Sequence, residues 1–178
     1  MGKQRRALII TGRLVQDHEY VYPYYRVLEE EYTLDVATPG KETVLGNIGV
    51  KVIPTKDTKE CRVEDYDLLI IPGGAKCMEY IRQDEQILKF IADFHKAGKV
   101  VSSICHAAQM LISARLVKGK KISGYYSLKD DVNNAGATYV DAPFVTDDRI
   151  VTCPHYKHMG PWMKETFAQV EKAMNNTR

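Results

Sequence analysis

One stretch of the chain, residues 99–116, restricts its fold more than any other. The stretch begins with KVVSSI, a β-branched run after Gly98 that predicts a buried strand. It ends with AAQMLISARL, which is rich in helix formers and carries apolar residues along one face. Because no turn residue separates the two halves, the chain must pass from strand to helix in one sharp step. The residues at that step are Cys105 and His106.

A cysteine at a strand-to-helix step has two interpretations. Cysteine is among the most buried residue types, so Cys105 can be an inert core residue. Alternatively, it is a nucleophile that projects above the sheet from a strained backbone. The unpaired N–H groups at the start of the helix would then favour a thiolate over a thiol, and they could hold an oxyanion.

Predicted strands and helices alternate along most of the chain. Strands are predicted at residues 6–11, 32–38, 67–71, 99–104, 121–123, 138–140, 144–146 and 150–152, and helices at 19–31, 84–97, 107–116, 128–135 and 162–174. The segment 41–66 lacks helical periodicity, and residues 48–53 predict a small β-hairpin excursion. We expect Pro23 in the first turn of its helix, where proline is tolerated. The alternation predicts an α/β fold with a mostly parallel sheet and helices on both faces.

Length and composition indicate one ordinary globular domain over residues 1–178. The chain is 44% hydrophobic and 27% charged, and we expect residues 175–178 to be frayed. A net charge of +2 with scattered basic residues argues against a nucleic-acid partner. The apolar run near the start is too short for a signal peptide or a membrane span. Without a secretory segment, four cysteines that lack close spacing indicate free thiols in a reducing cytoplasm. We also expect no membrane partner.

We expect the chemistry at the carboxyl edge of the predicted sheet, because ligands of open α/β sheets bind there. The segments that reach this edge are Thr11–Gly12, Pro72–Gly74, Cys105–His106 and residues 152–158. The glycine turn that follows the strand 67–71 has no side chains in the way. Its N–H groups could therefore join the N–H of His106 in an oxyanion hole.

Two more polar side chains are expected near the thiol. Glu19 opens the first predicted helix, and a carboxyl group that is partly desolvated beside a thiolate has a raised pKa and can donate a proton. The alternative for Glu19 is a first-turn acid that the helix dipole stabilises. His106 could activate Cys105 or shuttle protons, but its ring needs a third group to orient it. Glu79 is a candidate for that group, with a second subunit as one source.

Tyr125 and the loop 152–158 complete the predicted rim of the site. Cys153, His155 and His158 could be read as metal ligands on one loop. The sequence offers no evident fourth ligand and none of the paired spacings of a structural zinc site. We therefore expect neither a metal nor a cofactor.

Taken in order, these motifs resemble one protein family. The chain contains EYVYPYY at residues 19–25, IPGG at 71–74, SICHAAQML at 103–111, and then Tyr125 and KDD at 129–131. This combination covers about residues 6–170 and resembles the ThiJ/PfpI superfamily, closest to its PfpI-type intracellular protease and deglycase branch. The sequence ICH, in register with an upstream E-x-x-x-P and PGG, is specific as a combination, although any one of these motifs alone would not be. The resemblance favours the reactive interpretation of Cys105.

The resemblance implies a flavodoxin-like three-layer sandwich in which Cys105 is the nucleophile and Glu19 is hydrogen-bonded to it. It also implies an oxyanion hole formed by the backbone N–H groups of Gly74 and His106, with Gly73 at the pocket rim. Members of the family form dimers, and this branch builds hexamers in which an acid from a neighbour contacts the histidine. Glu79 lies at about that position, with an offset of one residue.

The chain departs from the family pattern at two places. The glycine and proline that usually follow the cysteine–histidine pair are Ala107 and Ala108, which favour the helix. The usual TSR-type loop reads TCPHYKH, so an arginine is lost and His155 and His158 are gained. Substrate preference therefore need not follow that of commoner members.

Three functions fit these residues. In the first, the Cys105 thiolate adds to a small-molecule carbonyl such as methylglyoxal or to its protein adduct, and Glu19 moves protons during hydrolysis, as in cofactor-free glyoxalases and deglycases. In the second, Cys105 attacks a peptide or amide and His106 protonates the leaving amine. In the third, a redox sensor, Cys105 is oxidised to a sulfinate that protonated Glu19 stabilises. We favour the first, because a sensor needs no proton donor and no segment indicates an extended peptide cleft.

Overall fold

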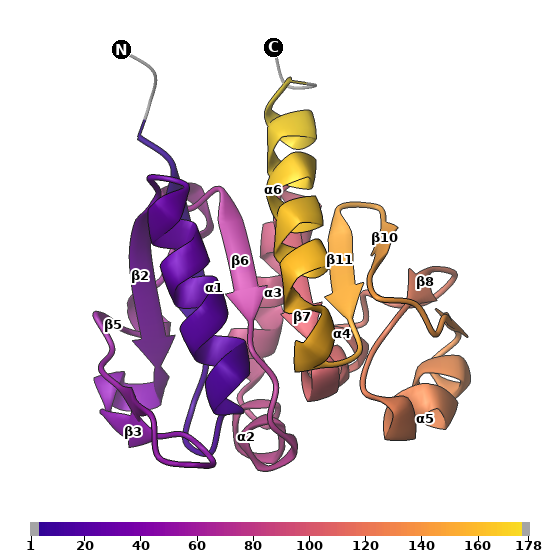
Figure 1. The fold of residues 1–178 in the computed structure, drawn as a ribbon, viewed down its shortest axis with the longest axis horizontal. Coiled ribbons are helices and arrows are strands. Elements are labelled where there is room, and N and C mark those ends of the chain that lie inside the picture. The colour runs from indigo at the N-terminus through magenta and orange to yellow at the C-terminus, as the bar shows by residue number, and fades with distance from the viewer. Residues whose placement is uncertain (1–3, 176–178) are drawn as a thin grey trace.

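A seven-stranded sheet forms the centre of the computed structural model, which describes residues 4–175. The strands lie in the order β10-β11-β7-β6-β1-β2-β5 (Figure 1). Their bounds are β1 Arg6–Ile10, β2 Thr33–Thr38, β5 Lys56–Asp57, β6 Leu68–Ile71, β7 Val100–Ile104, β10 Val145–Asp147 and β11 Ile150–Cys153. All neighbouring strands are parallel except β10, which pairs with β11 in the antiparallel sense. The prediction of a mostly parallel sheet is confirmed.

Helices cover both faces of this sheet. On one face α1 (Asp17–Glu29) and α6 (Met159–Asn175) lie side by side, in front of the sheet in Figure 1. On the other face α3 (Glu85–Lys96) packs against β7 and against α4 (Ala108–Ser113). The arrangement is the three-layer sandwich that the sequence predicts. Within residues 4–175, no helix is both long and apolar enough to cross a membrane.

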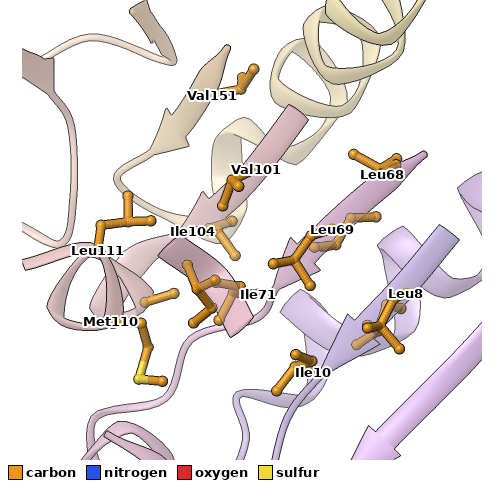
Figure 2. Close-up of a cluster of buried hydrophobic side chains, with 14 of the residues drawn as sticks. Leu8, Ile10, Leu68, Leu69, Ile71, Val101, Ile104, Met110, Leu111 and Val151 are labelled. Atoms are coloured by element: carbon orange, nitrogen blue, oxygen red, sulfur yellow. The ribbon is translucent and has the colours of Figure 1, made fainter. Parts of the chain in front are cut away.

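The centre of the core consists of strands that are apolar on both faces. All four residues of β6, LLII, are completely buried, as expected for a central parallel strand. Figure 2 shows Leu69 and Ile71 of this strand beside Ile10 of β1 and Ile104 of β7. The strands therefore hold their carboxyl ends at fixed positions along the lower edge of the sheet in Figure 1.

Short segments lie outside the main sheet. β3 (Val44–Leu45) and β4 (Lys51–Val52) form an antiparallel hairpin, which confirms the predicted excursion and moves its first strand closer to the amino terminus. The carboxylate of Asp17 holds the tip of this hairpin on α1, because it accepts the N–H groups of Ile48 at 2.8 Å and Val50 at 2.6 Å.

Several details differ from the sequence prediction. The predicted strands 121–123 and 138–140 form a separate parallel pair, β8 (Lys121–Ile122) and β9 (Thr138–Tyr139), with α5 (Lys129–Asn134) between them in sequence. Neither β5 nor α2 (Ala75–Ile81) was predicted, because two and seven residues are too few to show a periodic pattern.

The ends of two helices also differ from the prediction. Helix α1 begins two residues earlier than expected, so Pro23 lies beyond its first turn and removes one internal hydrogen bond of the helix. Asn175, expected to be frayed, is the last residue of α6, and residues 176–178 lie outside the described part of the chain.

Truncation of a central strand residue tests this core. Ile70 is 0% exposed in β6, whereas Ile48 at the hairpin tip is 71% exposed. We expect Ile70→Ala to lower the free energy of unfolding by about 2–5 kcal/mol, because the cavity it leaves is lined by rigid neighbouring strands. The matched change Ile48→Ala should alter it by less than about 0.5 kcal/mol. Urea unfolding monitored by circular dichroism measures both, and equal effects would contradict the assignment of the core.

Candidate active site

The chain turns from β7 into α4 at Cys105, as predicted. Ile104 is still extended, with φ −135° and ψ 143°, but Cys105 has φ +61° and begins the one-turn 3₁₀ helix Cys105–Ala107. A positive φ is uncommon for any residue with a side chain and is a form of stored backbone strain. The strained step expected at the nucleophile position is therefore present. Cys105 is 7% exposed, so the thiol is largely removed from solvent.

Glu19 lies in the first turn of α1, and its side chain is completely buried. Its Oε2 accepts the N–H of Gly73 at 2.9 Å, whereas its Oε1 has no hydrogen-bond partner within residues 4–175. Burial raises the pKa of this carboxyl group from 4.5 to about 7, although contacts with the Cys105 thiol and the Gly73 N–H act in the opposite direction. The carboxyl group is therefore protonated in a large share of molecules at neutral pH, as the sequence led us to expect.

The pKa of the Cys105 thiol is raised as well. Burial is the largest cause, and the nearby charge of Glu19 adds to it. The backbone N–H groups of His106 and Gly74 act in the opposite direction, as predicted for an oxyanion-hole pair, but they do not outweigh burial. These N–H groups favour a thiolate, as expected, but burial outweighs them and the net effect favours the neutral thiol. A charge on Glu19 therefore disfavours a thiolate at Cys105.

Two glycines allow this close approach of backbone and side chains. A Cβ atom at Gly73 would lie 2.5 Å from Oε2 of Glu19, 2.7 Å from the carbonyl oxygen of Ile104 and 3.0 Å from Cβ of Cys105. Gly74 has φ +108°, and a Cβ there would lie 2.7 Å from the carbonyl oxygen of Leu14. Gly73 therefore lies between the acid and the nucleophile, and neither glycine position has room for a side chain.

His106 contacts the thiol directly, with 3.3 Å between its Nδ1 and the Sγ of Cys105. Burial lowers the pKa of the imidazole. The ring of Tyr125 stacks on it, with centroids 4.6 Å apart and planes 25° apart. No carboxylate in the described residues forms a hydrogen bond or an ion pair with His106.

Glu79 does not supply that carboxylate within the chain. It lies on α2, mostly exposed, and pairs with Lys76 at 2.8 Å. The same-chain version of the predicted contact with His106 is therefore absent. The contact from a second subunit, and the self-association it requires, stay predictions.

The predicted rim residues are brought together only in part. The N–H of Tyr125 donates to the carbonyl oxygen of Cys105 at 3.1 Å, and the Tyr125 and His155 rings lie 6.2 Å apart. His158 donates its N–H to the carbonyl oxygen of His155, but no hydrogen bond or ring contact joins its side chain to the rim residues described. Cys153 Sγ donates to the same carbonyl at 3.3 Å. Nowhere in residues 4–175 do three Cys, His, Asp or Glu side chains converge in a way that could hold a metal ion.

Sequence reasoning missed His18 at this rim, and it included Tyr156 only as part of the loop 152–158, without a role of its own. The rings of His18 and Tyr156 stack with centroids 4.9 Å apart and planes 23° apart. The centroids of the Tyr156 and His155 rings lie 4.1 Å apart. The one available signal was the position of His18 directly before Glu19. Tyr156 follows His18 by 138 positions, and no pattern in the sequence connects the two.

An apolar groove of about 590 Å³ runs along the exposed side of α1. Its walls come from α1, from the hairpin through Ile48 and Val50, and from Met159 of α6. His18 lies in its lining, but Glu19, Cys105 and His106 do not. The thiol therefore does not lie within this groove.

The wedge formed by the glycine turn can be tested by adding one methyl group. We expect Gly73→Ala to lower the free energy of unfolding by about 1–3 kcal/mol, because the new Cβ overlaps the carboxyl group of Glu19 and a backbone carbonyl. Gly160→Ala is the control. Gly160 lies in helix α6, where alanine is favoured, and the nearest atom to the added Cβ would be Oη of Tyr22 at 3.9 Å. Urea unfolding measures both. A Gly73→Ala variant as stable as Gly160→Ala would contradict the close packing.

The raised pKa of Glu19 predicts a specific dependence of stability on pH. The folded state binds this proton more tightly than the unfolded chain, so the stabilisation is complete below pH 4.5 and is lost as pH rises through 7. Glu19→Gln cannot titrate. Its stability relative to the parent should rise by about 3 kcal/mol between pH 4 and pH 8. Urea unfolding across this range measures the difference in free energy of unfolding between variant and parent. The exposed control Glu64→Gln should show no such rise. The same absence of a rise in Glu19→Gln would disprove the shift.

The sequence of this chain is similar to those of known proteins. The model of the DJ-1/PfpI family matches residues 5–169. The chain is 32% identical over 160 residues to Deglycase PfpI of Pyrococcus furiosus, covering 90% of this chain and 96% of that protein. It is 33% identical over 175 residues to General stress protein 18 of Bacillus subtilis, covering 97% and 100%.

A solved structure shows the same flavodoxin-like fold. The ThiJ/PfpI domain protein from Brachyspira murdochii superposes with a TM-score of 0.90 at 16% identity, over 96% of this chain and 99% of that one. Family model, sequence relatives and fold thus agree along nearly the whole length. The chain belongs to the DJ-1/PfpI family.

Proposed function

We propose that this protein is a cofactor-free, cysteine-dependent hydrolase of reactive aldehydes such as methylglyoxal, or of the adducts they form with proteins. The observation that carries the proposal is the buried contact between Glu19 and Cys105, in which a carboxyl group with a pKa of about 7 can hold or release a proton beside a nucleophile. Relatives named deglycase, such as Deglycase PfpI, support this substrate class.

The proposed reaction begins with proton transfer and addition. His106, whose Nδ1 lies 3.3 Å from Sγ, takes the thiol proton, and sulfur adds to the aldehyde carbon. The N–H groups of His106 and Gly74 stabilise the oxyanion as it forms. Protonation of that oxygen gives a hemithioacetal.

The carboxyl group of Glu19 then moves protons within the adduct. As a carboxylate it removes the proton from the former aldehyde carbon, giving an enediol, and as an acid it returns that proton to the neighbouring carbon. The product of this shift is a thioester on Cys105. Water hydrolyses the thioester, so that methylglyoxal and one water give lactic acid and the free thiol.

Peptide hydrolysis is less well supported by the same site. A leaving amine needs a proton from His106, but burial lowers the pKa of that imidazole and no described carboxylate supports its charged form. An extended substrate also needs a groove that includes the nucleophile, and the apolar groove along α1 lacks it.

A redox role of Cys105 is the second candidate. A protonated Glu19 could stabilise a sulfinate in the same contact, and the relative named General stress protein 18 favours a role under stress. Intact mass after mild peroxide tests this role, since a clean gain of two oxygen atoms at Cys105 supports it. Loss of that gain in Cys105→Ala is the necessary control.

Methylglyoxal consumption, with lactate detected as the product, tests the proposed hydrolase. We expect Cys105→Ala to be at background and Glu19→Gln to lose about 100-fold or more of kcat, because both addition and proton transfer fail without these groups. Cys61→Ala, at a half-buried cysteine on the far side of β2, should retain full activity. If the parent protein consumes no methylglyoxal, or if Cys105→Ala remains active, the proposal is wrong.

A further inference from the structure

The first turn of α1 holds the backbone of Gly73 from two directions. The N–H of Gly73 donates to Oε2 of Glu19 at 2.9 Å, and its carbonyl oxygen accepts the N–H of Gln16 at 3.1 Å. The N–H of Glu19 donates in turn to the carbonyl oxygen of Gln16 at 3.0 Å. The place of the Glu19 carboxyl group beside Cys105 therefore depends on where the start of α1 lies relative to the glycine turn.

The hairpin β3–β4 binds the segment that leads into this helix. The N–H of Leu14 donates to the carbonyl oxygen of Leu45 at 2.8 Å, and the N–H of Asn47 donates to the carbonyl oxygen of Val15 at 2.8 Å. Leu14 has φ +61°, a strained conformation for a residue with a side chain, which persists only where surrounding contacts enforce it. The hairpin therefore helps to set the path of the chain from β1 into α1.

The side chain of Asp17, the first residue of α1, adds a charged link to the same hairpin. Its two carboxylate oxygens separately accept the N–H groups of Ile48 at 2.8 Å and Val50 at 2.6 Å, and the residue is buried. Hydrogen bonds to a charged carboxylate are roughly twice as strong as those between neutral groups. A Cβ at Gly46 would overlap Oδ1 of Asp17 and lie 2.7 Å from Cγ1 of Val50, so the hairpin packs closely on this carboxylate.

We propose that Asp17 is a positioning residue for the acid of the site, because it fixes the first turn of α1 on the hairpin β3–β4. Residues two positions apart on an α-helix point about 200° away from each other. Asp17 thus holds the turn on the side of the hairpin, and Glu19 reaches from the same turn toward the thiol. The inference rests on the proposed function only in taking Glu19 as that acid.

The pKa of Glu19 reports how well this turn is fixed. Burial is the largest cause of its raised value, so a turn that lets water reach the carboxyl group lowers the pKa from about 7 toward 4.5. The titratable groups that interact with Glu19 are the thiols of Cys77, Cys105 and Cys153. Burial raises the pKa of each thiol, so all three stay neutral while Glu19 titrates.

An NMR titration of the Glu19 carboxyl carbon tests the role of Asp17 without any substrate, with the signal assigned from its loss in Glu19→Gln. We expect Asp17→Asn to lower the pKa of Glu19 by about one unit or more, because an amide oxygen replaces only one acceptor and its NH2 group faces the other N–H. Gly46→Ala displaces the same carboxylate from the hairpin side and should also lower this pKa. It leaves Asp17 in place, so it tests the link even if Asp17→Asn does not fold.

A matched control separates positioning from a general loss of stability. Asp84 also accepts two backbone N–H groups at the start of a helix, those of Gln86 at 2.9 Å and Ile87 at 3.3 Å. Asp84→Asn should leave the pKa of Glu19 unchanged, since the titration follows folded molecules only.

An unchanged pKa of Glu19 in Asp17→Asn or in Gly46→Ala would overturn the inference, and so would an equal fall in Asp84→Asn. The titration needs no turnover. A failed methylglyoxal assay would therefore contradict the proposed function and leave this test intact.

Discussion

The contact between the carboxyl group of Glu19 and the thiol of Cys105 is the interaction around which this site is built. Both groups are largely removed from water, so neither can be charged without cost, and a charge on one raises the cost of a charge on the other. The result is a carboxyl group that can hold or release a proton near neutral pH beside a thiol that burial keeps protonated. Each function considered for this protein takes Cys105 as the reactive group, and the proposed hydrolase also needs Glu19 to move a proton within the adduct.

The fold brings the pair together through two backbone features. The positive φ of Cys105 turns the chain away from β7 before α4 begins, and the glycines after β6 let the PGG turn pass between the acid and the thiol. Both features lie at the carboxyl ends of adjacent buried strands, β7 and β6. The rigid strands thus fix the two turns relative to each other, which a pair of surface loops could not do.

The sequence predicts best what is decided locally. LLII and VVSSI predict buried strands from their own residues, and the sharp step at Cys105 follows from the absence of a turn residue. Helix α2 was missed because seven residues are stabilised by packing rather than by a visible pattern. The stacking of His18 on Tyr156 depends on a contact between distant segments, which no local pattern encodes.

The same limit applies to the charge state of the thiol. Helix-start N–H groups suggest a thiolate when the sequence is considered alone, but burial is a property of the whole fold and outweighs them. A thiol that must first lose its proton to a neighbour is protected from random alkylation and oxidation, yet it becomes reactive once a base is in place. Selective reactivity then depends on the geometry of His106 and Glu19 rather than on a permanently charged sulfur. A cysteine of this kind suits reaction with a bound aldehyde better than indiscriminate oxidation.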